Sequence, residues 1–574
     1  MKQRGLRRTV RGIAIVAVAA MLSACTGLPT SGDVTVVELG QAPDDPDFLP
    51  LASDPVPGAG PAEIVEGFIE AGITPADGWQ TARKFLTPEL AATWRPGAGV
   101  AIDASATSRT VISSVDEEES EADEVTEADV RVQTELVASV DETGAYVEAP
   151  GTGDLPFRLV RDSDGEWRIA DAPDGIVIDE NRFPVVFDAY PLNYFDQSWK
   201  RLVPDVRWFP RRAAIATPIV QALIGGAPSP WLEPAVQSAF PPDVRLALDA
   251  VPIDAEQVAD VALNRAALGL DQTTLARMRT QLQQTLTDAG VRVSQVRFSV
   301  DGRQLDAGIV ELEQSPASTG PLVLRDGVFG TIVGDDVVPI PGLSDVILSM
   351  PQPIAAIDVA ADDSHAAVQL GGGSVFIVGD GRVDELDARA GLVRPSIDRY
   401  GYTWSVPAGD PRALVAWGSD VSEHPIANAW PEASAVSHIR VAADGARMAA
   451  VVSVGGQRWV VAAAVIRDDN GMPVELGEMT PLGRVQGEAT GLVWLGPDRL
   501  GLLMELDGPM LVSQLVGGPA TIEAAPAEAR SIAGARSIGG VRMLGADGAL
   551  FVRSGSAWRE STSGVSVLAT RSGQ

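Results

Sequence analysis

The segment Val-Ala-Ala-Asp-Asp-Ser-His-Ala-Ala-Val at residues 359–368 returns at 441–451 as Val-Ala-Ala-Asp-Gly-Ala-Arg-Met-Ala-Ala-Val, 82 residues further on. In both copies, apolar residues flank a short polar turn, which is typical of two strands joined by a hairpin. The same theme recurs at 494–503 and 543–552. Because a propeller blade takes about 40 to 50 residues, the offset fits two blades. Residues 320–574 are therefore predicted to form an all-β propeller of about six blades.

The region before the repeats, 61–187, has mixed periodicity. Pro61 begins an amphipathic helix that ends at Gly72, and a second helix is predicted around Trp79 to Trp94. Apolar residues then alternate with polar ones from 130 to 140, which indicates a half-buried strand. A hairpin turns at 164–165. This pattern predicts a small α+β domain that resembles the cone-shaped domains of the nuclear-transport-factor type.

A second α+β domain is predicted at 188–316. It opens with a strand at 192–195, and two helices follow, with apolar stripes from Ile215 to Leu223 and from Leu275 to Leu286. Glycines at 225–226 and 290 end these helices. Val296, Phe298 and Val300 alternate into an Asp-Gly turn, which is typical of a strand entering a hairpin.

The first 24 residues read as a lipoprotein signal peptide. A basic leader precedes an apolar run at 13–22, which is too short to cross a bilayer core of about 30 Å. Leu22-Ser23-Ala24-Cys25 is a lipobox, and Cys25 is the chain's one cysteine. We expect cleavage after Ala24 to leave an N-palmitoyl, S-diacylglycerol cysteine that anchors the chain to the cell membrane. The alternative is an ordinary secretory signal with a chance cysteine beside its cleavage site.

The exported body is acidic and begins with a stalk. Residues 25–60 are rich in proline and lack any helical or strand period, which predicts a flexible, semi-extended tether. The chain has 44 Lys and Arg against 77 Asp and Glu, a formal net charge of −33. Such a body should be repelled by nucleic acids, so no nucleic-acid partner is expected.

The sequence offers little material for catalysis or metal binding. Its three histidines are His365, His424 and His438, and none has a recognisable nucleophile or ligand spacing. We expect His365 to lie in a turn, with convergence of the histidines on a metal as the alternative. No cofactor, metal site or enzymatic activity is predicted.

Two other segments have a structural and a functional interpretation. The acidic run from Asp116 to Asp129 lacks the spacing of a calcium loop and is predicted to be a solvated loop. Gly371-Gly372-Gly373 lacks the lysine and helix start of a phosphate loop and is predicted to be a hairpin bend.

Three tryptophans recur at intervals of thirteen, at Trp404, Trp417 and Trp430. We expect them to fill the space between blades. The alternative is an aromatic platform that stacks on a glycan ring.

In order, the lipobox, the α+β domain, the two-helix domain and the β-repeats resemble the LpqB family of actinobacterial lipoproteins. Within 188–316, short motifs are similar to the pattern of a GerMN domain: Tyr194-Phe195, Leu202-Val203-Pro204, Ala222-Leu223-Ile224-Gly225-Gly226 and Val300-Asp301-Gly302. The resemblance implies an accessory protein that binds the extracellular part of an MtrB-like sensor histidine kinase and modulates a two-component system with effects on the envelope and cell division. It supplies no catalytic residues.

Three functions follow as hypotheses. The first is the kinase accessory, lipid-anchored at the outer face of the cytoplasmic membrane. The second is an envelope scaffold that binds a cell-wall polymer, and the third is a hydrolase of wall glycans. The residues of any partner-binding face are not identifiable from the sequence.

Overall fold

The computed structural model describes residues 52–75, 78–115, 125–211, 214–313, 320–351 and 353–572. Cys25, the signal peptide and residues 25–51 of the stalk lie outside the described residues, as does 116–124 of the acidic run. Predictions about them remain predictions. The end of the acidic run, 127–129, begins a strand and not the predicted loop. The short 3-10 helices in the described part are η2 (Pro96–Ala98), η3 (Ala106–Ser108), η4 (Glu233–Ala235), η5 (Arg265–Gly269), η6 (Pro411–Ala413) and η7 (Ile538–Gly540).

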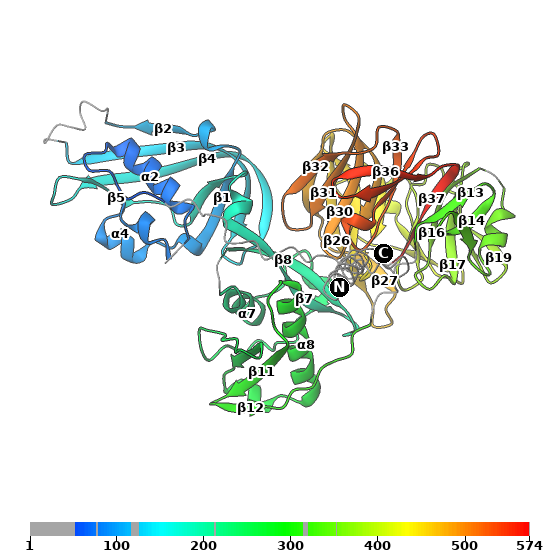
Figure 1. Cartoon of the computed structure of the whole chain (residues 1–574), viewed down its shortest axis with the longest axis horizontal. Coiled ribbons are helices and arrows are strands. Elements are labelled where there is room, and N and C mark those ends of the chain that lie inside the picture. The colour runs from blue at the N-terminus through cyan, green and yellow to red at the C-terminus, as the bar shows by residue number, and fades with distance from the viewer. Residues whose placement is uncertain are drawn as a thin grey trace, which may run out of the picture. The chain divides into compact units, whose positions relative to one another are not determined.

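The N-terminal domain packs a long helix on one twisted sheet (Figure 1). Its elements are α2 (Pro61–Gly72), α3 (Gln80–Arg83), α4 (Pro88–Thr93), β1 (Gly99–Asp103), β2 (Thr110–Ser113), β3 (Glu127–Asp141), β4 (Tyr146–Arg161), β5 (Trp167–Asp171) and β6 (Ile176–Asp179). The sheet order is β5-β4-β3-β1-β6, with β2 beside β3. Helix α2 buries Ile64, Val65 and Phe68 against it. Burial alternates along β3, so the predicted half-buried strand is confirmed.

The helix predicted from Pro61 to Gly72 is confirmed, whereas the single helix predicted around Trp79 to Trp94 is wrong. That segment forms two short helices, α3 and α4. Proline has no N–H to donate and favours the first turn of a helix, so Pro88 starts α4 rather than continuing α3. The Thr87 hydroxyl caps the new helix by accepting a hydrogen bond from the Leu90 N–H at 3.4 Å.

Helix α6 (Phe183–Val186) packs in the core of the N-terminal domain. The middle domain contains β7 (Phe187–Asp196), β8 (Leu202–Pro210), α7 (Ala216–Gly225), β9 (Val236–Gln237), β10 (Val258–Ala262), α8 (Gln272–Asp288), β11 (Gln295–Val300) and β12 (Arg303–Leu305). Its two three-stranded sheets have the orders β8-β7-β9 and β10-β11-β12. Leu223 of α7 and Met278 of α8 are fully buried in their shared core. Both predicted helices are confirmed, and the predicted turn after β11 has positive φ at Asp301 and Gly302.

The C-terminal region forms six successive antiparallel blades, the first two of which are joined into one eight-stranded sheet by the parallel pairing of β37 with β16. The blades are β37-β13-β14-β15, β16-β17-β18-β19, β20-β21-β22-β23, β24-β25-β26-β28, β29-β30-β31-β32 and β33-β34-β35-β36, with β27 beside β26. The strands of blades 1 to 3 are β13 (Leu322–Arg325), β14 (Val328–Val333), β15 (Asp336–Pro339), β16 (Ile354–Val359), β17 (His365–Leu370), β18 (Val375–Gly379), β19 (Arg382–Asp387), β20 (Ser396–Ile397), β21 (Thr403–Ser405), β22 (Val415–Trp417) and β23 (Glu423–Pro425), with helix α9 (Ser344–Leu348) after β15. Those of blades 4 to 6 are β24 (Ala435–Val441), β25 (Arg447–Val454), β26 (Gln457–Arg467), β27 (Pro473–Leu476), β28 (Thr480–Val485), β29 (Glu488–Trp494), β30 (Arg499–Glu505), β31 (Pro509–Leu515), β32 (Ala520–Ala524), β33 (Ala529–Ala533), β34 (Arg542–Gly545), β35 (Leu550–Ser554) and β36 (Ala557–Thr562).

The last strand closes the ring. Strand β37 (Val565–Arg571) pairs antiparallel with β13 and parallel with β16, so the C-terminal strand completes the first blade (Figure 1). The first strands of successive blades also contact one another around the ring. We call β37, β16, β20, β24, β29 and β33 the inner ring. The predicted propeller of about six blades is confirmed.

The sequence repeat maps onto equivalent places in two blades. Its first copy joins β16 to β17 in blade 2, and its second joins β24 to β25 in blade 4. Each copy ends an inner strand, turns and begins the second strand of the blade. The offset of 82 residues therefore equals two blades, as predicted.

Candidate partner-binding site at the domain junction

A cavity of about 1280 Å³ lies between the middle domain and the propeller. One wall consists of β8, α8 and the segment 309–313. The other wall consists of two propeller turns, 442–447 and 496–498. The first of these turns is the second copy of the sequence repeat. We call this cavity the junction cleft.

A buried arginine, Arg447, lines the junction cleft. The Arg447 guanidinium donates to the Asp444 carboxylate at 2.6 Å and to the Pro204 carbonyl of β8 at 3.4 Å, and it also donates to the Pro497 carbonyl. It lies 4.9 Å from the centre of the Trp494 ring. Because Arg447 is fully buried, its charge depends on these partners for compensation. The contact connects both propeller turns with the middle domain.

An ion-pair network joins the same two domains at the edge of the junction cleft. The Glu313 carboxylate accepts hydrogen bonds from Lys200 at 3.0 Å, Arg201 at 2.7 Å and Arg399 at 3.0 Å. Hydrogen bonding from Lys200 is the main cause that lowers the pKa of Glu313, and Arg201 reinforces it. Arg399 belongs to the propeller, whereas the other two cations belong to the middle domain. Glu313 therefore ties the segment after β12 to both domains.

Tyr400 adds an aromatic contact to this network. Its ring lies 4.0 Å from the Arg467 guanidinium, and its hydroxyl donates to Asp196 of the middle domain at 3.5 Å. Arg467 in turn donates to the buried Asp398 at 2.7 Å. Burial raises the pKa of Tyr400 to about 12, so the phenol stays protonated and able to donate.

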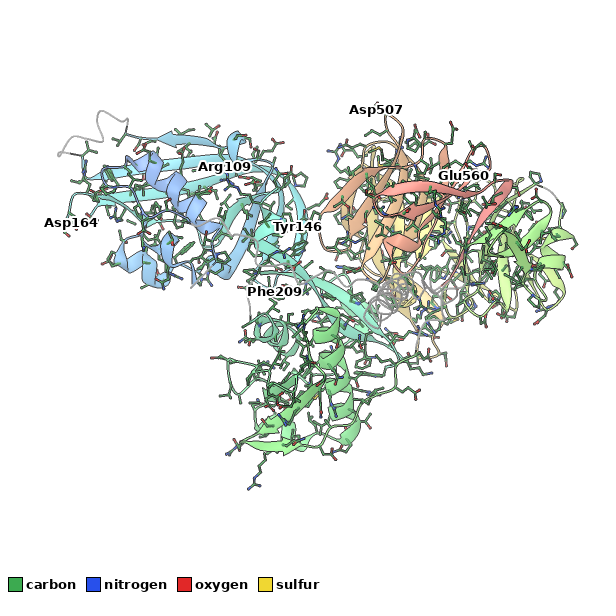
Figure 2. The ribbon with its side chains drawn as sticks, viewed as in Figure 1. Arg109, Tyr146, Asp164, Phe209, Asp507 and Glu560 are labelled. Carbon is green, nitrogen blue, oxygen red and sulfur yellow. The ribbon has the colours of Figure 1, made fainter. Side chains whose placement is uncertain are left out.

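Apolar packing supports the polar contacts. Ala446 and Ala464 of the propeller belong to the core cluster of the middle domain. Trp208 of β8 donates from its indole nitrogen to the Gly517 carbonyl at 2.8 Å. The same ring packs 6.3 Å from Tyr146 of the N-terminal domain, which is labelled in Figure 2. The three domains thus share contacts instead of being joined by linkers alone.

The walls of the junction cleft are of mixed polarity. Ile309 exposes 68% of its surface there, an unusual amount for a large apolar side chain. On α8, Asp288 accepts hydrogen bonds from Asn193 at 2.8 Å and from Gln284 at 2.7 Å. Burial raises the pKa of Asp288, and the nearby Asp498 raises it further. Exposed apolar and charged groups side by side suit recognition of a polypeptide.

The three histidines do not meet in the fold. His365 begins β17, directly after the predicted turn, His424 lies in the outer strand β23, and His438 lies in the inner strand β24. Within the described residues, no group of three or more His, Cys, Asp or Glu side chains could hold a metal ion. The alternative interpretation, convergence of the histidines on a metal, therefore has no basis in the described residues.

The neighbourhood of His365 differs from a hydrolytic triad. The Ser364 hydroxyl lies 2.9 Å from His365 Nδ1 and also donates to Asp362 at 2.6 Å. In a triad the carboxylate orients the histidine, whereas here it accepts a hydrogen bond from the serine hydroxyl. The arrangement is a hydrogen-bonded turn, and Gly371-Gly372-Gly373 likewise forms a turn, between β17 and β18.

Two of the three tryptophans are buried between blades. Trp404 is fully buried and Trp430 is 1% exposed, both in the core cluster of blades 3 and 4. The Trp404 indole donates to Asp398 at 3.0 Å, and that of the half-buried Trp417 donates to Ser405 at 2.9 Å. The packing interpretation is confirmed for Trp404 and Trp430. An aromatic platform of all three rings is excluded because a buried ring cannot stack on a sugar.

The junction residues were not singled out by sequence reasoning. Glu313 and Arg399 lie 86 positions apart, and no local periodicity connects them. Arg447 carried a signal, because it replaces His365 at the same position of the repeat. An arginine beside a run of small apolar residues indicates a buried cation that needs a partner.

Three family models match successive parts of the chain. They are described as the N-terminal domain of Lipoprotein LpqB (residues 54–184), Germane, sporulation and spore germination (191–306), and the Lipoprotein LpqB beta-propeller domain (327–568). None of these descriptions names an enzyme. In the described part of the chain, no helix has both the length and the apolar character needed to cross a membrane.

Curated relatives align with most of the chain. The chain is 28% identical to Lipoprotein LpqB of Streptomyces coelicolor, with 86% of each chain covered, and 26% identical to that of Thermobifida fusca, with 89% of each covered. Among solved structures, a nidogen/laminin complex matches with a TM-score of 0.31 and 8% identity, covering 43% of this chain and 96% of that one. The tandem GerMN domains of GerM from Bacillus subtilis match with a TM-score of 0.18 and 12% identity, covering 33% and 59%.

Those TM-scores are low, so the architecture rests on this chain's own strand pairing and on the family matches. Two LpqB models cover the first and last domains, and full-length relatives align across all three. The chain belongs to the LpqB family of lipoproteins, with a GerMN-type domain between its N-terminal and propeller domains.

Proposed function

We propose that this protein is a lipid-anchored accessory of the cell envelope that binds the extracytoplasmic domain of an MtrB-like sensor histidine kinase and modulates its signalling. The observation that carries the proposal is the junction cleft, about 1280 Å³ between two domains that buried contacts hold together. Its exposed Ile309 and its charged walls suit a polypeptide ligand. The lipid on Cys25 would place the protein at the outer face of the cytoplasmic membrane.

Membrane anchoring would make even a modest affinity sufficient. Two proteins confined to one membrane meet at a high effective concentration, so a weak contact is occupied more often than in solution. Removal of the lipid should therefore reduce binding without changing the contact surface. Kinase output would change only to the extent that binding favours one kinase state over another.

The first experiment is affinity capture of the full-length lipoprotein after cross-linking in cells. We expect the sensor kinase to be recovered with the wild type and lost with Cys25→Ala, which cannot be lipidated. Recovery of cell-wall polymer without the kinase would contradict the proposal and favour the scaffold function.

A site-specific version tests the cleft itself. A photo-crosslinking amino acid replaces exposed Glu311 at the junction cleft. In the matched control, it replaces the exposed Glu560 of the outer strand β36; Figure 2 labels Glu560. We expect a kinase adduct from position 311 and none from position 560. Equal adducts from both positions would show that contact is not directed by the cleft.

A further inference from the structure

Three arginines gather at the inner ring of the propeller. Arg394 lies two residues before β20, Arg440 lies in β24 and Arg530 lies in β33, so they come from blades 3, 4 and 6. Arg440 donates to the carbonyl of Pro395, the residue after Arg394, at 3.4 Å. Strands β20, β24, β29 and β33 contact one another in succession around the ring. The charges of Arg440 and Arg530 both lower the pKa of Arg394, as this placement implies. We call these residues the inner arginine cluster.

Among the described residues, only Arg440 of the cluster has an acidic partner. Arg440 donates to the Asp358 carboxylate at 3.0 Å and to the Thr570 hydroxyl at 2.8 Å. Asp358 lies in β16 and Thr570 in β37, while the ring neighbours of β24 are β20 and β29. The Arg440 side chain therefore reaches past its neighbouring strand to blades 1 and 2, and the cluster lies inside the ring of strands.

The positive charges of Arg394 and Arg530 have no negatively charged partner among the described residues. In the part of the chain that the structure describes, neither Arg394 nor Arg530 has a hydrogen-bond acceptor or an acidic partner. Both side chains are open to water, yet Arg394 is crowded enough that burial is the main cause lowering its pKa. Arginine keeps its charge under such conditions. Although the chain has 77 acidic residues, none of those described forms an ion pair with Arg394 or Arg530.

The net charge of the site follows from its neighbours. His438, on the same strand as Arg440, has its pKa lowered to about 4 by burial and by Arg394 and Arg440, against a hydrogen bond with Thr490. It is neutral at pH 7. Three arginines and one aspartate, Asp358, therefore leave the site with two uncompensated positive charges. Guanidinium groups with free N–H donors match the paired oxygens of phosphates and carboxylates.

We propose that the inner arginine cluster is a binding site for a small oxyanion that carries two negative charges. Arg394 and Arg530 bind its oxygens directly, and Arg440, held by Asp358 and Thr570, adds the third positive charge. Because the arginines come from three blades, the bound anion links blades 3, 4 and 6 across the ring. This site is separate from the junction cleft, and it does not depend on the proposed kinase contact.

The test measures anion binding to the full-length protein in detergent. Thermal unfolding and isothermal titration calorimetry are followed at pH 7.5 and constant ionic strength, with inorganic phosphate, succinate, acetate or chloride as the varied anion. We expect saturable binding and stabilisation by phosphate or succinate, and neither by acetate or chloride. The stronger of the two dianions identifies the ligand class as phosphate or dicarboxylate.

Matched variants separate a site from a general salt effect, since phosphate also stabilises proteins by exclusion from their surface. Arg394→Gln and Arg530→Gln should each weaken binding at least about tenfold. Arg559→Gln, on the exposed outer strand of the same blade as Arg530, should bind like the wild type. If one cluster variant fails to fold, the other carries the test. Absence of saturable binding, or an equal loss in Arg559→Gln, would overturn the proposal.

Discussion

The junction cleft and the inner ring use arginine in opposite ways. At the junction, Arg447 has a carboxylate oxygen at 2.6 Å, and Arg201 and Arg399 share Glu313 at 2.7 and 3.0 Å. In the inner ring, Arg394 and Arg530 have no such partner among the described residues. The paired arginines of the junction hold two domains together. The unpaired arginines of the inner ring repel one another, and their N–H donors remain open to an anion. The difference predicts opposite effects on stability when each kind is removed.

The largest effect is expected at the buried junction arginine. Arg447→Ala should lower the free energy of unfolding by about 3–5 kcal/mol, because it leaves the Asp444 charge and two backbone carbonyls buried without their partner. Urea unfolding followed by circular dichroism measures the loss. Arg559→Ala, at an exposed position, is the control and should change stability by less than about 0.5 kcal/mol. A loss below about 1 kcal/mol in Arg447→Ala would show that this buried arginine does not stabilise the junction more than an exposed one does.

An acid-dependent loss is expected next, at the inner ring. Folded His438 has a pKa of about 4, below the ordinary value of 6.5, so the unfolded chain binds more protons between these values. The stability contributed by neutral His438 is complete above pH 6.5 and falls as the pH drops toward 4. We expect the wild type to lose about 2 kcal/mol more than His438→Gln over this range.

The measurement for His438 is urea unfolding of both proteins at several pH values from 8 to 4. From pH 8 to 7 the difference in stability between them should stay constant, which serves as the internal control. Parallel curves down to pH 4 would mean that the histidine titrates as it does in the unfolded chain.

A smaller effect is expected at the partly exposed junction network. Glu313→Gln removes the negative charge shared by three cations, but 42% of the Glu313 side chain is exposed, so water screens the pairs. We expect a loss of about 0.5–1 kcal/mol at low salt that shrinks at 1 M NaCl. Thermal unfolding at the two salt concentrations measures it, and a salt-independent loss would indicate a packing defect.

The smallest effect has the opposite sign. Arg394→Gln removes one of three neighbouring positive charges and should raise the free energy of unfolding by a few tenths of a kcal/mol in phosphate-free buffer. Arg559→Gln serves as the control, with no gain expected. A loss of more than about 1 kcal/mol in Arg394→Gln would mean that this arginine is a structural partner, and the contrast with the junction would disappear.

Most of the fold was predictable because its signals are local. The apolar stripe from Ile64 to Ile69 and the alternation along 130–140 each depend on one element's own period. The segment from Trp79 to Trp94 was mispredicted because its apolar residues allow one helix, while Thr87 and Pro88 begin a new one. Local capping chemistry decided that break.

The sites were less predictable because they depend on contacts between distant residues. Arg440 and Thr570 lie 130 positions apart, and they meet only because β37 returns to the first blade. One ion pair, between Asp358 and Arg440, has a spacing that is visible in the sequence. Asp358 and Arg440 are 82 positions apart, the offset of the repeat, and each immediately precedes one copy of it.

The sequence by itself determined the order of the three domains and the propeller repeat, because apolar periodicity and turn residues act within a few positions. Only the tertiary structure decided which charges are paired. Glu313 gathers cations from two domains, whereas Arg394 and Arg530 come together without an acid. Coulomb interactions depend on distance in space and on burial, and neither is set by separation along the chain.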